Sequence, residues 1–203
     1  MKKTLRWFAL ALVLSAFVYM ISVVSDKRQL QDGILRLHVV ANSDGGDDQA
    51  VKLQVRDAVL EEVETLTAQA GTKDEAQDIL AAHLDRLETV ANEKLASLGV
   101  EDRASVSLEQ EAFPKREYDT FTLPAGVYDS LRVTIGAGEG RNWWCVVFPG
   151  LCVPAASDGV ADTAAGAGFS ESASGAITGA PRYEIRFYLL DLLGRLENFF
   201  HKG

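Results

Sequence analysis

Cysteine and histidine are scarce in this chain, and their scarcity excludes several kinds of site. The 203 residues include 2 cysteines and 3 histidines. A structural zinc site needs four protein ligands, so two cysteines are too few for one. The spacing of His38, His83 and His201 matches no metal signature such as H-E-x-x-H. We therefore expect no metal, no cofactor and no catalytic residue, since no pattern in the chain composes an active site.

Basic residues are also few, because 20 Lys and Arg face 29 Asp and Glu. The first 25 residues contain Lys2, Lys3 and Arg6 but no acidic residue. Without them, the net charge of the remaining chain changes from −9 to −12. Nucleic acid and anionic lipid surfaces would repel so acidic a domain. We expect no nucleic-acid partner and no small-molecule substrate, which leaves a protein partner or simple solubility.

The N-terminal segment has no charged residue from Phe8 to Val24. As a helix rising about 1.5 Å per residue, this run spans about 26 Å, close to the roughly 30 Å of a hydrocarbon core. The preceding basic residues keep the N-terminus in the cytoplasm, so the rest of the chain is extracytoplasmic. Residues 1–25 are therefore a signal peptide or a membrane anchor, inserted through residues 5–24 if uncleaved. Val23-Val24-Ser25 is a weak cleavage site, and the sequence leaves cleavage open.

The main domain is predicted over residues 30–153, in the α+β class. Ile34–Ala41 alternates like a strand, with Leu35, Leu37, Val39 and Ala41 on one face. A polar loop leads to a helix that ends near Leu66. Thr72 and Glu75 have capping-box spacing and begin a second helix, which Gly99 ends.

Period-two patterns follow the helices. Phe121–Leu123 and Tyr128–Ile135 flank a turn at Pro124–Gly126 and are predicted to pair as antiparallel strands. Trp143–Phe148 is apolar on both faces, which is typical of a central or doubly covered strand. The predicted order is β-α-α-β-β-β, with two helices packed on a mostly antiparallel sheet.

The C-terminal part of the chain differs in composition. In Pro154–Pro181, 20 of 28 residues are Ala, Gly, Ser or Thr, so we expect a flexible linker over 154–181. Residues 182–203 form an amphipathic tail whose start also alternates like a strand. Its predicted apolar line consists of Ile185, Leu189, Leu192, Leu196 and Phe199.

The segment Arg141–Cys152 holds two tryptophans and both cysteines. Gly136, Gly138 and Gly140 precede it, but they lie between predicted antiparallel strands, so the nucleotide-binding context is missing. Three states remain open for Cys145 and Cys152: a disulfide across the Pro149-Gly150 turn, free buried thiols, or a nucleophile at Cys145. A nucleophilic cysteine would need a histidine base, and none lies near it in sequence.

Two groups of residues together carry a family resemblance. The segments 35–44 and 48–57, and the segment 142–152, resemble stage II sporulation protein R of endospore-forming Firmicutes. The resemblance extends over roughly Leu30 to Val153, together with the N-terminal export segment and the string Tyr183–Phe187 of the tail. It implies a signalling protein made in the forespore and exported into the space between the forespore and mother-cell membranes. Its implied partner is the membrane-embedded aspartic protease that processes pro-sigma-E in the mother cell.

The resemblance brings no catalytic residues, so we select candidate partner-binding positions from its motifs and from the anchoring role of Trp and Arg. These positions are Arg36, His38, Asn42, Ser43, Asp44, Arg141, Asn142, Trp143 and Trp144. The alternative that both indoles belong to the core stays open. Two other functions also stay open: an exported enzyme that uses Cys145 as nucleophile, and a membrane-tethered structural module whose tail binds another helix.

Overall fold

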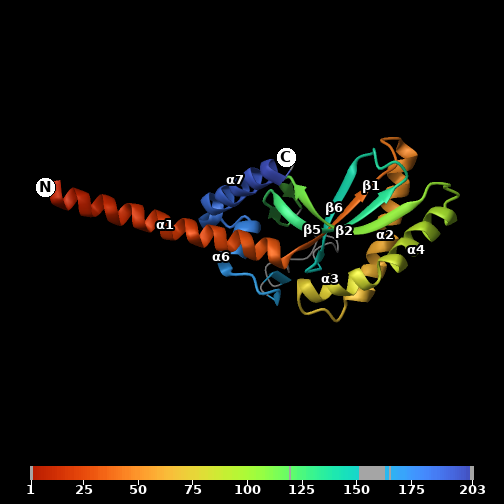
Figure 1. Cartoon of the computed structure of the whole chain (residues 1–203), viewed down its shortest axis with the longest axis horizontal. Coiled ribbons are helices and arrows are strands. Elements are labelled where there is room, and N and C mark those ends of the chain that lie inside the picture. The colour runs from red at the N-terminus through yellow and green to blue at the C-terminus, as the bar shows by residue number, and fades with distance from the viewer. Residues whose placement is uncertain (1, 119, 151–162, 165, 202–203) are drawn as a thin grey trace.

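A computed structural model describes residues 2–118, 120–150, 163–164 and 166–201 of the chain. A long N-terminal helix, α1 (Lys2–Gly33), projects from a body that holds all the other elements (Figure 1). The remaining helices are α2 (Gly46–Thr67), α3 (Lys73–Ala82), α4 (Leu84–Ser97), α6 (Glu171–Ile177) and α7 (Glu184–His201), with a 3-10 turn at Pro181–Tyr183. The strands are β1 (Leu35–Val40), β2 (Ala104–Phe113), β3 (Arg116–Glu117), β4 (Thr122–Leu123), β5 (Gly126–Ile135) and β6 (Asn142–Phe148).

The α+β class is confirmed, and the main sheet is mixed. Its strand order is β2-β5-β1-β6. β5 pairs antiparallel with β2, and β6 pairs antiparallel with β1, but the central pair β1 and β5 is parallel. This parallel pairing was not predicted, because it joins strands separated by three helices and three strands.

The predicted hairpin around Pro124–Gly126 is wrong. β4 pairs with β3 in a separate two-stranded sheet, in which Leu123 lies opposite Arg116. β5 instead forms a ten-residue ladder with β2, from Ala104 opposite Ile135 to Phe113 opposite Gly126. This long ladder satisfies the backbone of β5 along its whole length, which a short hairpin with β4 could not do.

One face of the sheet packs on α2, α3 and α4. Val55, Val59 and Val63 of α2 are buried there with Leu37 and Leu131 of the sheet. The second predicted helix is interrupted at His83, whose backbone (φ −123°) separates α3 from α4. The N-cap at Thr72 is confirmed, since the Glu75 amide donates to Thr72 Oγ1 at 3.2 Å, while Glu75 Oε2 accepts from the Gly71 amide at 2.8 Å instead of from Thr72. Gly99, with φ +71°, follows α4 as predicted.

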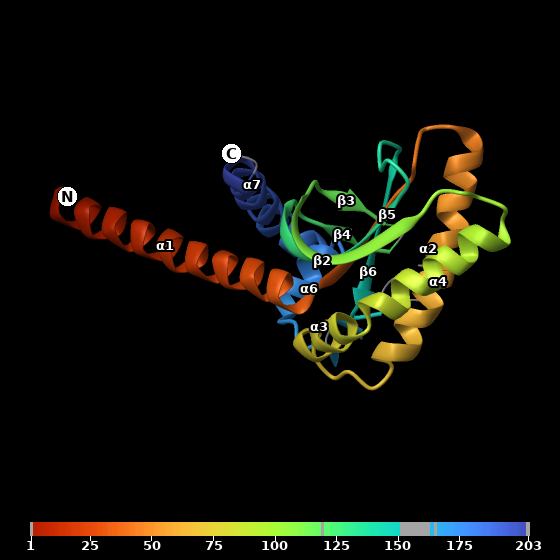
Figure 2. The same ribbon diagram turned by 45° about the vertical axis from the view of Figure 1, so that its right-hand side comes forward.

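The opposite face of the sheet is also covered, so the domain has helices on both sides rather than on one (Figure 2). Val23 and Leu30 of α1, Ile177 of α6 and Leu190 of α7 are buried in this second core. All six residues of β1 are buried because both faces of the strand are covered. The alternating pattern of β1 predicted that only one face of the strand is buried. The other face is buried as well, because the second core packs on it.

The strand β6 lies at the edge of the main sheet, so of the two predicted alternatives, a central or a doubly covered strand, the central position does not hold. Its second half is nonetheless covered on both faces: Cys145 and Val147 belong to the core under α2–α4, and Val146 belongs to the opposite core. The first half of the strand is open, with Asn142 and Trp143 exposed.

The described part of the expected linker is folded. Phe169, Ala173 and Ile177 are buried beside α1, and Ser170 caps α6 by accepting from the Ala173 amide at 3.1 Å. A Cβ added at Gly33 would overlap the Phe169 ring. Here the small residues permit close packing of α6 rather than chain flexibility. Residues 154–162 and 165 of that segment lie outside the described residues.

The C-terminal segment is helical, and the face that packs on the domain is not the predicted apolar line. Leu190, Asp191 and Gly194 are the buried positions of α7. A Cβ at Gly194 would overlap the Ala125 carbonyl oxygen, so the glycine allows the helix to touch the backbone before β5. Asp191 Oδ1 accepts from the Ala125 amide at 3.0 Å. Most of the predicted apolar line therefore points away from the domain.

Among the described residues, α1 is the one helix long and apolar enough to cross a membrane, judged by length and composition, and a signal sequence meets the same criterion. It runs without a break past Val24 and into the body (Figure 1). Val23, Asp26 and Leu30 are its buried residues. The helix is thus both the apolar N-terminal segment and a component of the second core.

Candidate partner-binding surface

The loop after β1 and the turn before β6 lie against each other. The Asn42 side-chain oxygen accepts from the Ala137 amide at 2.9 Å, and Asp44 Oδ1 accepts from the Arg141 amide at 2.7 Å. The Gly140 amide donates to the Ala41 carbonyl at 2.9 Å. The two segments that carry the family resemblance are therefore neighbours in space.

The glycines of this turn allow the close approach of the loop. Gly136 has φ +56°, and a Cβ there would overlap the side-chain oxygen of Asn42. A Cβ at Gly140 would overlap the Ser43 carbonyl oxygen. The spaced glycines thus hold two loops together and do not form a phosphate cradle, since the loop backbone already occupies the space beside them.

Buried Lys52 of α2 fixes the end of the turn. Its ammonium group donates to the Arg141 carbonyl at 2.8 Å and to the Gln49 side chain at 2.7 Å. Burial and then the nearby charges of Arg141 and Arg56 lower the pKa of Lys52. Hence the hydrogen bond from Lys52 fixes the position of Arg141, and with it the start of β6.

Adjacent Trp143 and Trp144 point to opposite faces of the sheet, as alternation in a strand requires. The guanidinium carbon of Arg56 lies 4.2 Å from the centroid of the Trp143 ring. That of Arg116 lies 3.6 Å from the Trp144 ring. Trp143 is 38% exposed, whereas Trp144 is half-buried and lies beside His38. Of the two indoles, only that of Trp143 offers a large apolar area to a partner.

His38 is part of a polar network on the face of the sheet opposite α2–α4. Its Nδ1 lies 2.9 Å from Glu111 Oε1, and its Nε2 lies 2.9 Å from Asn142 Oδ1. Arg132 Nη1 donates to the same Glu111 oxygen at 2.7 Å. Burial tends to raise the pKa of Glu111, but the hydrogen bond and charge of His38 and the charge of Arg132 lower it below its usual value.

Cys145 and His38 lie on opposite faces of the sheet. Cys145 is paired in register with Leu37 and belongs to the core under α2–α4. His38 follows Leu37 and therefore points to the other face. Consequently His38 cannot serve as a base for a nucleophilic Cys145.

Arg36 is fully buried and does not reach the surface. Its Nη2 donates to the Tyr118 hydroxyl at 2.9 Å, and its guanidinium carbon lies 3.9 Å from the Phe113 ring centroid. Burial raises the pKa of Tyr128, which also borders Arg36. Contacts with aromatic faces thus stabilise the charge inside the second core.

The structure distributes the candidate positions over three degrees of exposure. The four exposed positions are Asp44, Arg141, Asn142 and Trp143. The three half-buried positions are Asn42, Ser43 and Trp144. The two buried positions are Arg36 and His38. The exposed four lie together at the loop junction, because Asp44 bonds the Arg141 amide. We refer to these four residues as the loop-junction surface. Arg56 and Arg116, which stack on the two indoles, were missed: Arg56 lies within the segment 48–57 but its position indicated a solvated helix face, and no motif marks Arg116.

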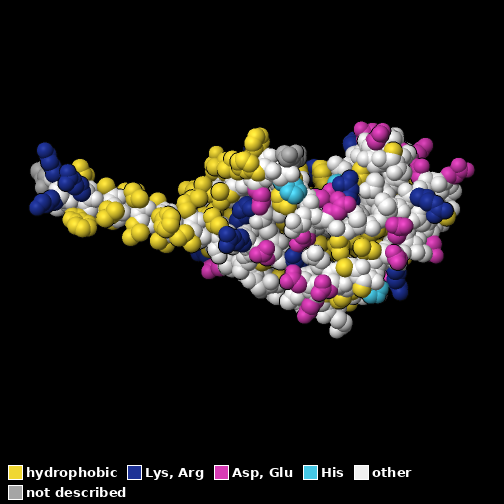
Figure 3. Space-filling view, viewed as in Figure 1, with side chains coloured by type: hydrophobic (Ala, Val, Ile, Leu, Met, Phe, Trp, Pro, Cys, Tyr) yellow, Lys and Arg dark blue, Asp and Glu magenta, His cyan; other side chains and the backbone are white. Residues whose placement is uncertain are grey.

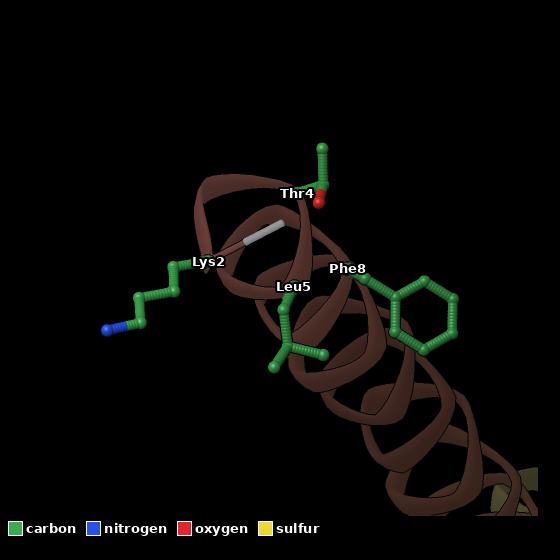
Figure 4. Close-up of a pocket in the computed structure, with 4 residues that line it drawn as sticks. All are labelled: Lys2, Thr4, Leu5 and Phe8. Atoms are coloured by element: carbon green, nitrogen blue, oxygen red, sulfur yellow. The ribbon is translucent and has the colours of Figure 1, made fainter.

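Several other features carry no site. Cys152 lies outside the described residues, so the Cys145–Cys152 bridge stays a prediction. Within the described ranges, no group of three or more His, Cys, Asp or Glu residues could hold a metal ion. Lys2, Thr4, Leu5 and Phe8 border a surface depression near the tip of α1 (Figure 4). All four belong to α1 itself, far from the loop-junction surface.

Comparison with known proteins identifies the family. The model of the stage II sporulation protein R family matches residues 31–158, which include every strand of the structure. The chain belongs to the stage II sporulation protein R family. Stage II sporulation protein R of Bacillus subtilis (strain 168) is 36% identical to it over 132 residues, which are 65% of this chain and 59% of that protein. The alignment thus spans about three-fifths of the length of this curated relative. No solved structure matches the chain.

Membership in the stage II sporulation protein R family confirms the resemblance expected from the motifs. The family match begins at Gln31, within the last turn of α1, and continues past the end of β6. It therefore covers the loop-junction surface and the His38 network. α7 lies outside the matched range, although it packs on the matched domain through Asp191 and Gly194.

Proposed function

We propose that this chain is an exported sporulation signal. It is made in the forespore, enters the space between the two membranes, and activates the membrane-embedded aspartic protease that processes pro-sigma-E. The observation that carries the proposal is the family match over the whole sheet. The apolar α1 supports export, and the acidic composition supports a protein partner rather than nucleic acid.

In this proposal the partner protease carries out the catalysis, and this chain supplies the surface that binds the protease. The loop-junction surface supports that division, since it combines an exposed indole with Arg141 and the carboxylate of Asp44. Exposed Trp and Arg side chains are typical anchors of protein interfaces. The surface is also pre-ordered by the Asn42 and Lys52 hydrogen bonds, which lowers the entropy cost of binding.

We further propose that α1 stays attached as a membrane anchor. Cleavage after Ser25 would remove Val23 from the second core and cut the helix immediately before buried Asp26. Asp26 pairs with Arg186 of α7, and its Oδ1 accepts from the hydroxyls of Ser170 and Ser172 at 3.0 Å. These contacts favour a retained helix over a cleaved peptide. Determining the N-terminus of the protein recovered from sporulating cells tests this point: a chain that begins at Asp26 would contradict it.

Gene deletion tests the signalling role. Processing of pro-sigma-E should stop in the deletion strain while early forespore transcription continues. Re-introduced Trp143→Ala should restore little processing, because truncation of an interface anchor costs about 2 kcal/mol or more of binding, roughly a thirtyfold loss of affinity. Glu93→Ala, at an exposed position on α4, is the matched control and should restore processing fully. Normal processing in the deletion strain would overturn the proposal.

A further inference from the structure

The helix α7 carries an apolar face that no described residue covers. Its members are Ile185, Tyr188, Leu192, Leu196, Phe199 and Phe200, with exposed fractions of 72%, 67%, 41%, 50%, 75% and 77%. At 100° per residue they lie within an arc about 120° wide. Single exposed apolar residues are ordinary, but a continuous stripe of this kind marks an interaction surface.

The opposite face of α7 is firmly docked, so the exposed stripe does not result from a loosely attached helix. Gly194 touches the Ala125 backbone, and the Asn198 side-chain amide donates to the Phe113 carbonyl at 2.7 Å. Glu197 accepts from the Val127 amide at 3.1 Å. The orientation of the stripe is therefore set by the domain.

The start of α7 lies level with the end of the apolar run of α1. The Arg186 guanidinium carbon lies 5.1 Å from the Tyr19 ring centroid, and Arg186 Nη2 donates to Ser22 Oγ at 3.1 Å. Exposed apolar side chains continue along α1 up to Ile21. If α1 spans a bilayer, this level is the membrane interface, and Ile185 and Tyr188 lie there beside Arg186. Tyrosine is enriched at that depth.

The rest of α7 lies on the same side of the domain. Both ribbon views place α6 and α7 at the end of the body from which α1 projects, with α2 and α4 at the other end (Figures 1 and 2). The space-filling view shows apolar side chains along α1 and again over α7 (Figure 3). Lys27 pairs with Glu197 at 2.8 Å, so α7 rises from the interface toward its C-terminus. Spanning helices commonly tilt by about 0–40°, and contact of Phe199 and Phe200 with lipid requires α1 to tilt toward the side of α7.

Charge does not oppose this arrangement. The net charge of −12 argues against electrostatic adsorption to anionic lipid, but the acidic groups on the docked side of α7 are paired. Asp191 pairs with Arg195 at 2.6 Å, and Glu197 pairs with Lys27. Moreover, α1 holds α7 at the bilayer, so its contact with lipid is an intramolecular event at high effective concentration.

We propose that α7 lies in the interfacial layer of the bilayer that α1 spans, with its Ile185–Phe200 stripe against the lipid. Amphipathic helices lie in the plane of the membrane interface with their apolar face against the lipid. In α7 the other face is packed on the domain. A bilayer is favoured over a protein partner because the stripe is level with the spanning run. The domain is then attached to the membrane at two places, which fixes its orientation instead of letting it swing on α1.

Quenching by brominated lipid tests the proposal. The full chain is inserted into phosphatidylcholine vesicles with or without bromine on the acyl chains. Tyr188→Trp and Phe199→Trp are compared with Glu93→Trp on α4 as the matched control. Native Trp7 of α1 reports insertion of the span, and wild-type emission is subtracted from each variant. We expect bromine to remove most of the added emission at positions 188 and 199 and none at 93.

The possible outcomes are distinct. Added emission at 188 and 199 that bromine leaves unchanged, with Trp7 quenched, overturns the proposal. Blue-shifted but unquenched emission at these positions shows that a second copy or a protein covers the stripe, and it also overturns the proposal. Unquenched Trp7 shows that α1 does not span the bilayer, and the premise fails with it. None of these results depends on signalling to the protease.

Discussion

The carboxylate of Asp26 in α1 forms an ion pair with the guanidinium of Arg186 in α7, 160 residues further along the chain. Both side chains are almost completely buried, at 8% and 12% exposure. Asp26 also bonds the hydroxyl of Ser170, the residue that caps α6. One carboxylate therefore connects the N-terminal helix to both C-terminal helices.

Breaking this pair should destabilise the domain strongly. Asp26→Asn leaves Arg186 buried without its counter-charge, and loss of one partner of a buried pair costs about 3–5 kcal/mol. The free energy of unfolding in mild detergent, measured with urea, checks the value. Glu171→Gln is the control: it removes the exposed partner of Arg182, and exposed pairs contribute little to stability because water screens them. Equal losses in the two variants would contradict the role of Asp26.

The Glu111 network should make stability sensitive to acid. The folded state holds the pKa of Glu111 below the 4.5 of the unperturbed group, so the folded protein binds this proton less tightly than the unfolded chain. The resulting stabilisation is complete above pH 4.5 and is lost as the pH falls below it. Free energies of unfolding measured from pH 6 downward should decline less steeply for Glu111→Gln than for the wild type. An unchanged slope would show that Glu111 contributes nothing.

The two glycines that flank the loop junction should respond oppositely to alanine. Gly140→Ala forces a Cβ into the Ser43 carbonyl, and such overpacking costs about 1–3 kcal/mol. Gly46→Ala, at the first residue of α2, meets nothing within 4 Å and should be neutral or stabilise by about 0.4–1 kcal/mol. Chemical denaturation of the two variants side by side measures the difference. Comparable stabilities would mean that the loops are not in contact.

The cysteines should be joined in the exported protein. A bridge between Cys145 and Cys152 closes a short loop and contributes somewhat under about 3 kcal/mol in the chain-entropy model. Thiol titration of the denatured, unreduced protein should find no free thiol, and reductant should lower the melting temperature. Titration of two thiols would rule out the bridge and leave buried free cysteines at this position.

Local elements were largely predictable from the sequence, because short-range interactions determine them. The strand at Ile34–Ala41, the helix cap at Thr72 and the stop at Gly99 depend on neighbouring residues, and the structure confirms all three. The break at His83 was missed, since the apolar spacing continues across it. The loop-junction residues were selected from motifs, but only their packing separates exposed Trp143 from buried Arg36.

Long-range pairing was not predictable in the same way. The hairpin prediction failed because β5 finds partners in β1 and β2, and no local pattern encodes that choice. The small residues of α6 resemble a linker in composition. They pack only because α1 and Tyr183 provide surfaces close enough for residues without large side chains.

By itself, the sequence determined the apolar N-terminal run, the acidic excess and the family motifs, all of which depend on composition and order along the chain. Only the tertiary structure decided which apolar side chains are available to partners or lipid. In α7 the helical period allows an apolar stripe, but the fit of Gly194 against Ala125 selects the face that is buried. The helix approaches the domain most closely where Gly194 contacts the Ala125 backbone. The stripe from Ile185 to Phe200 lies on the opposite side of the helix and is therefore exposed.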